Sequence, residues 1–455
     1  MMTQFASGDI AGALAFAEKK HGKTIDKGDE LTWLLECGSM QFYQGQHEKA
    51  LDSFRRCEEL IEEYDERALI SLRDTGNEAL VVISNENALP YRGWCRDRVS
   101  LGILKSLAYL GIGREDSFRA QVKRLREEHK KIQEDYNEFF EAEQERLEEA
   151  KAKNEEIAKK VYAQDYLGDP RNAEYVESMA VTEKVANEGY GNFLNPLSLF
   201  LSGLALARDG AWDSARIEFQ RLYEALPNSP LARQYYATAL LRSGHPLPQE
   251  LEGTQPFEFP LERDCVYLLY AHDMTASFDQ VAIYYPLMIA WPVCVYHPAL
   301  LPTMGVQAEG RSYSVSPISN MDAILAQEFK LRTPARLVRT MVATLAKEAA
   351  FVATMTALER SNQNNSSSRT AVIIGTAIAY KSYQAMFNTA DTRGWFTLPK
   401  EYCLTQFPMP QDRLLSLQGV PGAGEIRIPD GCGSAIVYVN AMTPAAVQCQ
   451  VFPMR

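Results

Sequence analysis

Asp391, Arg393 and Trp395 bring an acid, a base and an aromatic ring together within five residues of the sequence. The three residues alternate along the chain. On a β-strand they would share one face, where the arginine could pair with the acid and stack on the indole. Such a group could hold a charged ligand, or it could close a domain as an ion pair covered by an aromatic ring. We favour the structural role and keep the ligand site as the alternative.

Other residues that could bind a metal or a phosphate lack the usual spacing. The six histidines contain no H-x-x-x-H or H-E-x-x-H pair. His272-Asp273 with Asp279 could contact a metal, but we interpret these residues as a polar loop between strands. The run from Gly419 to Gly424 lacks the Lys-Ser/Thr of a phosphate-binding loop, so we expect a hairpin turn. Because a G-x-S-x-G motif is also missing, we expect no enzyme activity, catalytic residue, metal or cofactor.

The eight cysteines are scattered, with no C-x-x-C pair that would indicate zinc or redox chemistry. Buried free thiols are the simplest interpretation. Spacing alone leaves disulfides open, because an even number of cysteines in an exported protein is compatible with them.

Two segments carry the spacing of tetratricopeptide (TPR) helical hairpins. Elements of this kind must hold the charged and aromatic side chains described above in position. The residues at that spacing are Trp33, Gly38, Phe42, Gly45, Ala50 and Phe54 in the first segment, and Gly203, Gly210, Ala215, Phe219 and Pro227 in the second. Small residues let the two helices of a hairpin approach closely, while the aromatic rings fill the groove between successive hairpins. A more degenerate pair is expected over 91–125, and the chain begins in the middle of a repeat.

The amino-acid composition changes near residue 245, and this change divides the chain into two predicted domains. Residues 1–245 are expected to form a TPR-like helical repeat domain that includes a long charged helix at about 119–160. We interpret that helix as solvent-exposed and stabilised by many i,i+4 ion pairs. A coiled coil that binds a partner is the alternative. Prolines and glutamates over 246–260 then indicate a linker.

Residues 255–455 are expected to form a mixed α/β domain with a helical insertion at about 320–388, in which Thr333-Pro334 begins the second helix of a hairpin. Short apolar runs on either side of the insertion are typical of strands. The predicted fold class is therefore α+β, an N-terminal TPR-like α-solenoid followed by a smaller β-rich C-terminal domain with an inserted helical hairpin.

The formal net charge of −12 argues against a nucleic-acid partner, since it repels phosphate backbones. No stretch reaches the roughly 18 to 20 apolar residues of a membrane-spanning helix; the best candidate, Ala371 to Tyr380, is about half that length. The first residues also lack the basic region, apolar run and cleavage site of a signal peptide. The sequence as written is therefore expected to be cytoplasmic.

The order of these features resembles a family of bacterial TPR-containing lipoproteins of unassigned biochemical function. Its members are often encoded beside a small lipoprotein that resembles a penicillin-binding-protein activator. The resemblance rests on the opening half-repeat, Tyr91-Arg-Gly-Trp-Cys-Arg-Asp-Arg98, Asn195-Pro196, Ala290-Trp-Pro292, Met321-Asp322, Arg339 with Lys347, and Ala390-Asp-Thr-Arg-Gly-Trp-Phe-Thr-Leu-Pro399. It implies a periplasmic or outer-membrane-associated protein, although the export signal and lipid-modified cysteine of the family are not in this sequence.

The function expected from these observations is a non-catalytic protein-interaction scaffold, part of a bacterial cell-envelope assembly. Its concave helical groove would hold a segment of a partner protein, while the β-domain docks on a second component. One alternative is an enzyme or small-ligand receptor with a site near Asp391, Arg393 and Arg339. A third possibility is self-assembly into a ring or filament, because repeats with uncapped ends can stack on one another.

Overall fold

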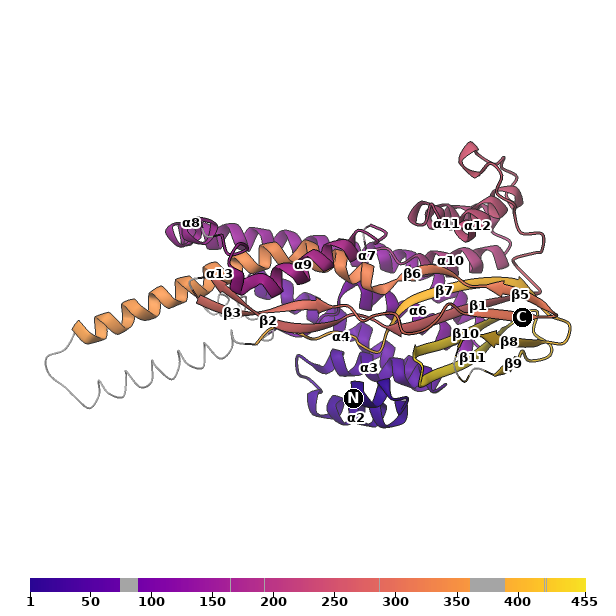
Figure 1. Cartoon of the computed structure of the whole chain (residues 1–455), viewed down its shortest axis with the longest axis horizontal. Helices are drawn as coiled ribbons and strands as arrows, with labels where there is room; N and C mark the ends of the chain where they lie inside the picture. Colours follow the sequence, from indigo (N-terminus) through magenta and orange to yellow (C-terminus); the bar gives the residue numbers. More distant parts are fainter. Residues whose placement is uncertain are drawn as a thin grey trace.

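The chain folds into an elongated molecule in which helices precede most of the strands along the sequence (Figure 1). The computed structural model describes residues 1–73, 89–163, 165–191, 193–285, 287–360, 389–420, 422 and 424–455. This mixed composition agrees with the predicted α+β class. The helices of the first half are α1 (Met2–Ala6), α2 (Ile10–Thr24), α3 (Glu30–Tyr43), α4 (His47–Arg73), α6 (Cys95–Gly111), α7 (Glu115–Lys153), α8 (Glu155–Ala163), α9 (Ala173–Ala186), α10 (Pro196–Arg208), α11 (Trp212–Ala225) and α12 (Pro230–Arg242).

The two predicted repeat segments form the helical hairpins α3–α4 and α10–α11. A Cβ atom on Gly38 would lie 2.5 Å from the ring of Phe54, and one on Gly203 would lie 2.7 Å from the ring of Phe219. Any larger residue at either glycine would therefore displace the phenylalanine or push the helices apart. The same glycine–phenylalanine contact sets the helix separation in both hairpins.

Tryptophan in place of Ala50 or Ala215 is expected to unfold the local hairpin. Neither alanine has exposed surface, so the larger ring must displace its neighbours at a cost of about 1–3 kcal/mol or more. Thermal unfolding should show a lower melting temperature for each variant. Ser214→Trp, at an exposed position of α11, is the matched control and should melt like the parent. Unchanged melting of both alanine variants would show that the hairpin register is wrong.

The long charged helix is shorter and more buried than its composition predicts. α7 ends at Lys153, because Asn154 takes a non-helical backbone (φ −132°, ψ 46°), and α8 follows. Phe139 and Leu147 are buried, and α7 packs against α4, α6, α10 and α13. Surface ion pairs such as Lys130–Glu134 are present at 3.3 Å. α7 is therefore half-buried rather than fully solvated, since its sparse apolar residues pack against other helices of the chain.

A five-stranded sheet with the strand order β11-β10-β1-β7-β6 forms the centre of the second half. β1 and β10 are parallel, and the other neighbours are antiparallel. One face of the sheet packs against the helices, and the other packs against a four-stranded sheet with the order β5-β4-β8-β9. The strands of the two sheets are β1 (Cys265–Met274), β4 (Gly305–Ala308), β5 (Arg311–Ser314), β6 (Ser316–Asn320), β7 (Pro399–Pro408), β8 (Leu414–Gln418), β9 (Glu425–Arg427), β10 (Ser434–Thr443) and β11 (Ala446–Met454).

The strands β2 (Ser277–Tyr285) and β3 (Leu287–Val295) pair separately from these sheets and pack against α9 and α13. α13 (Met321–Arg360) is one helix that continues through Pro334, so the predicted start of a second helix at this proline is wrong. Proline in a helix interior costs about 3 kcal/mol. Burial of Phe329 before the proline and Met341 after it offsets that cost. The rest of the predicted insertion, 361–388, lies outside the described residues.

The five-stranded sheet covers the inner face of the helices, where a partner segment was expected. The ring of Phe42 in α3 lies 5.4 Å from that of Tyr438 and 6.1 Å from that of Phe452, while Phe200 in α10 lies 6.2 Å from Tyr267. Phe42 therefore packs against the sheet and does not fill a groove between hairpins. One hydrophobic cluster contains residues from both halves of the chain.

The predicted linker also packs against this cluster. It contains the 3-10 turn η3 (Gln249–Leu251), and Leu251 has no exposed surface. All eight cysteines lie in the described part of the chain and are free; seven are buried and Cys449 is exposed. Among the described helices, none is both long enough and apolar enough to cross a membrane.

Candidate functional site

Asp391 and Arg393 form an ion pair in an extended segment that precedes β7. The arginine donates from Nε to Asp391 Oδ1 at 2.8 Å and from Nη2 to Oδ2 at 2.7 Å. It also donates to Asp29 Oδ1 and to the carbonyl oxygen of Leu89, each at 3.0 Å. Burial opposes the charge, but the hydrogen bond and charge of Asp391 raise the pKa of Arg393 overall. The pair thus ties this segment to the loops that precede α3 and α6.

Trp395 does not cover this ion pair. Its side chain is fully buried, and its indole Nε1 donates to Ser39 Oγ at 3.1 Å. The predicted alternation fails because the segment has no strand partner before Pro399. The ring beside the Arg393 guanidinium is instead Tyr91, at 5.8 Å. Trp395 therefore belongs to the core between α3 and the sheet.

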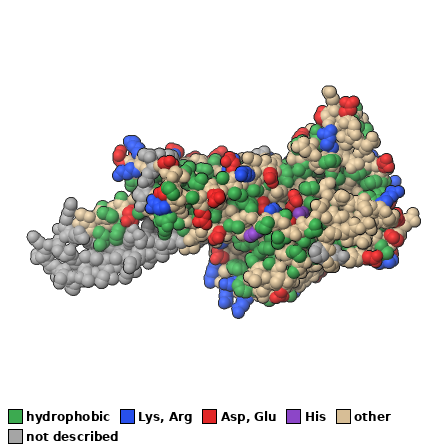
Figure 2. Space-filling view, in the orientation of Figure 1, with side chains coloured by type: hydrophobic (Ala, Val, Ile, Leu, Met, Phe, Trp, Pro, Cys, Tyr) green, Lys and Arg blue, Asp and Glu red, His purple; other side chains and the backbone are tan. Residues whose placement is uncertain are grey.

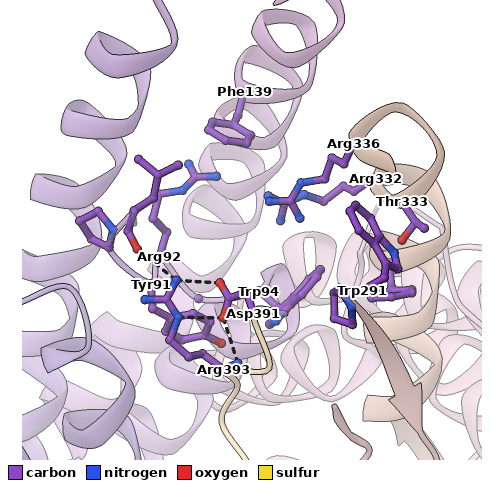
Figure 3. A pocket seen from close by; sticks show the side chains of 15 residues that line it. Tyr91, Arg92, Trp94, Phe139, Trp291, Arg332, Thr333, Arg336, Asp391 and Arg393 are labelled. Carbon is purple, nitrogen blue, oxygen red and sulfur yellow. Dashed lines mark hydrogen bonds and ion pairs between the residues drawn. The ribbon is translucent and has the colours of Figure 1, made fainter. Parts of the chain in front are cut away.

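A cavity of about 70 Å³ opens beside the Asp391–Arg393 pair (Figure 3). Since a water molecule needs roughly 10–15 Å³ by this measure, the cavity has room for about five waters or for one carboxylate or phosphate group. Aromatic and cationic side chains dominate its wall. The rings are Tyr91, Trp94, Phe139, Trp291 and Phe329, and the cations are Arg92, Arg332, Arg336 and Arg393. Asp391 is the single acidic residue among the described residues of the wall.

Three of these arginines converge from two parts of the chain. Figure 3 shows Arg332 and Arg336 of α13 pointing toward Arg92, which precedes α6. The Arg92 guanidinium lies 3.5 Å from the ring centroid of Phe139, and that of Arg332 lies 5.5 Å from the same ring. Burial and the charge of Arg332 lower the pKa of Arg92 to about 10, although Asp65 opposes the shift. Like charges held this close favour an anion in the cavity.

The carboxylates that balance these arginines lie outside the cavity wall. Glu143 of α7 is buried and lies 3.2 Å from Arg336 and 3.7 Å from Arg339. Burial raises the pKa of Glu143, but the surrounding guanidinium groups lower it overall, so the carboxylate stays charged. Arg332 pairs with Glu328 at 2.8 Å, and Arg92 pairs with Asp65 at 3.0 Å. The cluster as a whole is thus nearly neutral, while the wall itself presents mainly guanidinium groups.

The sequence carried a signal for this arginine row that we did not recognise. Arg332, Arg336 and Arg339 follow one another at spacings of four and three, which places them on one face of a helix. Only Arg339 was considered as a site residue. The helix break expected at Pro334 placed Arg332 and Arg339 on different helices.

The repeat residues do not contribute to this cavity. Trp33 packs against the ring of Phe16 in α2 at 6.0 Å, and the others hold their own hairpins together. The predicted residues that stay outside the described wall are Trp33, Gly38, Ala50, Phe54, Gly203, Ala215, Phe219, Arg339 and Trp395.

The predicted polar loop at His272 and Asp273 is instead the end of strand β1. His272 Nδ1 lies 2.9 Å from Asp273 Oδ2. Asp279 is on β2, where its Oδ1 accepts a hydrogen bond from the backbone of Gln280. The three residues therefore do not form the metal-binding group that was weighed from the sequence.

A second hollow, of about 900 Å³, lies between the α6–α7 turn and the loop before β10. Its wall mixes Arg114 and Arg119 with Glu115, Asp116 and Asp430. This hollow presents neither one sign of charge nor, among its described residues, an aromatic ring. The arginine cavity is therefore the better candidate for a binding site.

No family model matches the chain, and neither a curated protein nor a solved structure matches it. The resemblance carried by residues 390–399 stays a hypothesis.

Proposed function

We propose that the protein is a non-catalytic interaction scaffold that binds an acidic group of a partner protein in the arginine-lined cavity. The convergence of Arg92, Arg332 and Arg336 on a small aromatic-walled space carries this proposal. Guanidinium groups bind carboxylates and phosphates through paired hydrogen bonds, and aromatic rings hold the guanidinium planes in place.

The size of the cavity favours one acidic group over a whole metabolite. Sites for cofactors and small molecules hold about 300–1,000 Å³, whereas this cavity holds about 70 Å³. An acidic side chain or a terminal carboxylate of a larger partner fits that space. An enzyme or small-ligand receptor at the same place is the alternative proposal.

The helical hairpins support the scaffold role, because TPR-like arrays commonly present binding surfaces. The inner face of α3 and α10 packs against the chain's own sheet, so we place the partner at the cavity and not in a concave groove. An envelope component as the partner, and a periplasmic or outer-membrane setting, rest on the family resemblance alone.

Self-assembly through an open repeat edge is the weakest of the proposals. The first helices contact the sheet, and Thr443 Oγ1 donates to the carbonyl oxygen of Ala6 at 2.9 Å. A neighbouring copy would have to displace this contact. A monomeric mass in light scattering at high concentration would exclude self-assembly.

Acidic peptides are expected to bind the wild-type protein more tightly than matched peptides with Asn and Gln in place of Asp and Glu. The double variant Arg332→Gln/Arg336→Gln should lose at least about tenfold in affinity, since each charge-assisted hydrogen bond contributes about 1.5–3 kcal/mol. Fluorescence anisotropy with labelled peptides measures this loss. Arg311→Gln, an exposed arginine on β5, is the matched control.

Melting temperatures establish that each variant is folded before its affinity is compared. Equal affinities for the acidic and amide peptides would reject the proposal. Full competition by micromolar inorganic phosphate or acetate would favour the small-ligand receptor, because a peptide anchored by several contacts should resist such low concentrations.

A further inference from the structure

His272, Glu401 and Cys403 lie together on one face of the five-stranded sheet, where β1 ends and β7 begins. In the antiparallel register His272 is opposite Glu401, and Tyr270 is opposite Cys403. Residues two apart on a strand share a face, so the three side chains converge. His272 Nε2 lies 3.4 Å from Glu401 Oε2 and 3.5 Å from Cys403 Sγ.

Asp273 fixes the orientation of the His272 ring. Adjacent strand residues normally point to opposite faces, but Asp273 has a left-handed backbone with φ 55° that breaks this alternation. Its buried carboxylate lies 2.9 Å from His272 Nδ1 and accepts hydrogen bonds from the backbone of Leu300 at 2.8 Å and Leu301 at 3.2 Å. With Nδ1 donating to Asp273, Nε2 presents its lone pair toward Glu401 and Cys403.

The two separations from His272 match those between the ligands of one tetrahedral metal ion. Bonds to zinc of about 2.05 Å from nitrogen, 2.1 Å from oxygen and 2.3 Å from sulfur, at the tetrahedral angle, separate nitrogen from oxygen by about 3.4 Å and nitrogen from sulfur by about 3.6 Å. The observed separations are 3.4 Å and 3.5 Å, and the three donor atoms all lie within 4.8 Å of one another.

We propose that His272, Glu401 and Cys403 bind a divalent transition-metal ion, with Zn²⁺ the best match to their nitrogen, oxygen and sulfur donors. Asp273 acts as the carboxylate that orients the histidine, and the stacked Tyr270 ring, 4.5 Å away, holds the imidazole in place. The Glu401 side chain is 29% exposed, which gives the ion a path from solvent. Three protein ligands leave a fourth position for water or for a ligand from a partner.

An ion-paired imidazolium is the competing explanation for the same geometry. The hydrogen bond with Asp273, together with those to Cys403 and Glu401, raises the pKa of His272 to about 11 although burial opposes the charge. A protonated ring between two carboxylates would need no metal. The two explanations differ in whether the cluster takes up zinc and protects the thiol.

Zinc titration of the full chain, after chelator treatment and dialysis, distinguishes them. We expect one Zn²⁺ per chain with a Kd of about 10 μM or tighter, and a loss of at least about 100-fold in Cys403→Ser and in His272→Gln. Asp273→Asn should bind about 10–100-fold more weakly, as expected for a residue that orients a ligand. Cys449→Ser, which removes the exposed cysteine, is the matched control and should bind like the parent.

Protection of the thiol gives a second readout that does not depend on affinity. Zn²⁺ should slow alkylation of Cys403 by iodoacetamide, followed by peptide mass spectrometry, at least tenfold, while alkylation of Cys449 should not change. Absence of uptake by the wild-type chain at 100 μM Zn²⁺, or equal uptake by the folded Cys403→Ser variant, would overturn the proposal. So would alkylation of Cys403 at the same rate with and without Zn²⁺.

Discussion

Two polypeptides that span 1–245 and 255–455, produced separately, are expected to remain unfolded, whereas coexpression should give the native fold. The helix-facing side of the five-stranded sheet explains this result. Leu269, Leu404 and Phe452 are at most 1% exposed and belong to the same cluster as the helices. Exposing each large apolar side chain costs about 1.5–3 kcal/mol. A few such residues therefore equal the whole stability of a typical domain, about 5–15 kcal/mol.

Polar contacts strengthen this dependence between the halves. Glu36 of α3 accepts hydrogen bonds from the backbone of Phe396 at 2.8 Å and of Thr397 at 3.2 Å. Burial raises the pKa of Glu36 to about 7. A carboxylate held there without these donors would be strongly unfavourable, so the helical half needs the segment that follows residue 390.

Circular dichroism and size-exclusion chromatography of the fragments, alone and mixed, measure this expectation. Each fragment alone should lack a cooperative thermal transition, and the mixture should elute at the mass of the full chain. Two monomeric fragments that melt cooperatively would instead establish 246–260 as a true boundary, as the change in composition predicts.

Local packing rules predicted the parts of the fold that depend on neighbours in sequence. The close contact of Gly38 with Phe54 follows from repeat spacing, because both residues belong to one hairpin. The continuous helix α13 could not be predicted in this way. Pro334 is a strong local breaker, and only the burial of Phe329 and Met341 against distant elements overrides it.

The candidate sites were harder to predict, since strand register and helix packing assemble them. The pair Asp391–Arg393 is close in sequence and was predicted, whereas Arg92 and Arg332 meet only after α6 and α13 have packed. Similarly, nothing in the spacing of His272 and Glu401 indicates that β1 and β7 place them opposite each other. The useful signals were the arginine row at helical spacing and an acid directly after a histidine.

The second large effect is expected at Arg96, which has no exposed surface. Its guanidinium donates to Asp97 Oδ1 and to Thr275 Oγ1, each at 2.9 Å, and to the carbonyl oxygen of Trp395 at 3.2 Å. These contacts join α6 to the end of β1 and to the segment before β7. Asp97 also accepts hydrogen bonds from the hydroxyl of Tyr91 and from the backbone of Trp94.

Arg96→Met is therefore expected to lower the free energy of unfolding by about 3–5 kcal/mol, because it leaves the buried Asp97 carboxylate without its counter-charge. Arg96→Lys should recover only part of this loss, since an ammonium group cannot reach three acceptors in one plane. The double variant Arg96→Met/Asp97→Asn should cost less than the sum of the single changes.

Denaturant unfolding of Arg96→Met, Arg96→Lys, Asp97→Asn and the double variant measures these differences. Arg55→Met is the matched control, because Arg55 pairs with Asp52 on the surface, with side chains 59% and 72% exposed, and should change stability by less than about 0.5 kcal/mol. Additive effects of Arg96→Met and Asp97→Asn would show that the pair is not coupled. In that case the loss on replacing Arg96 would come from its hydrogen bonds to Thr275 and to the carbonyl oxygen of Trp395, which join α6 to the second half of the chain.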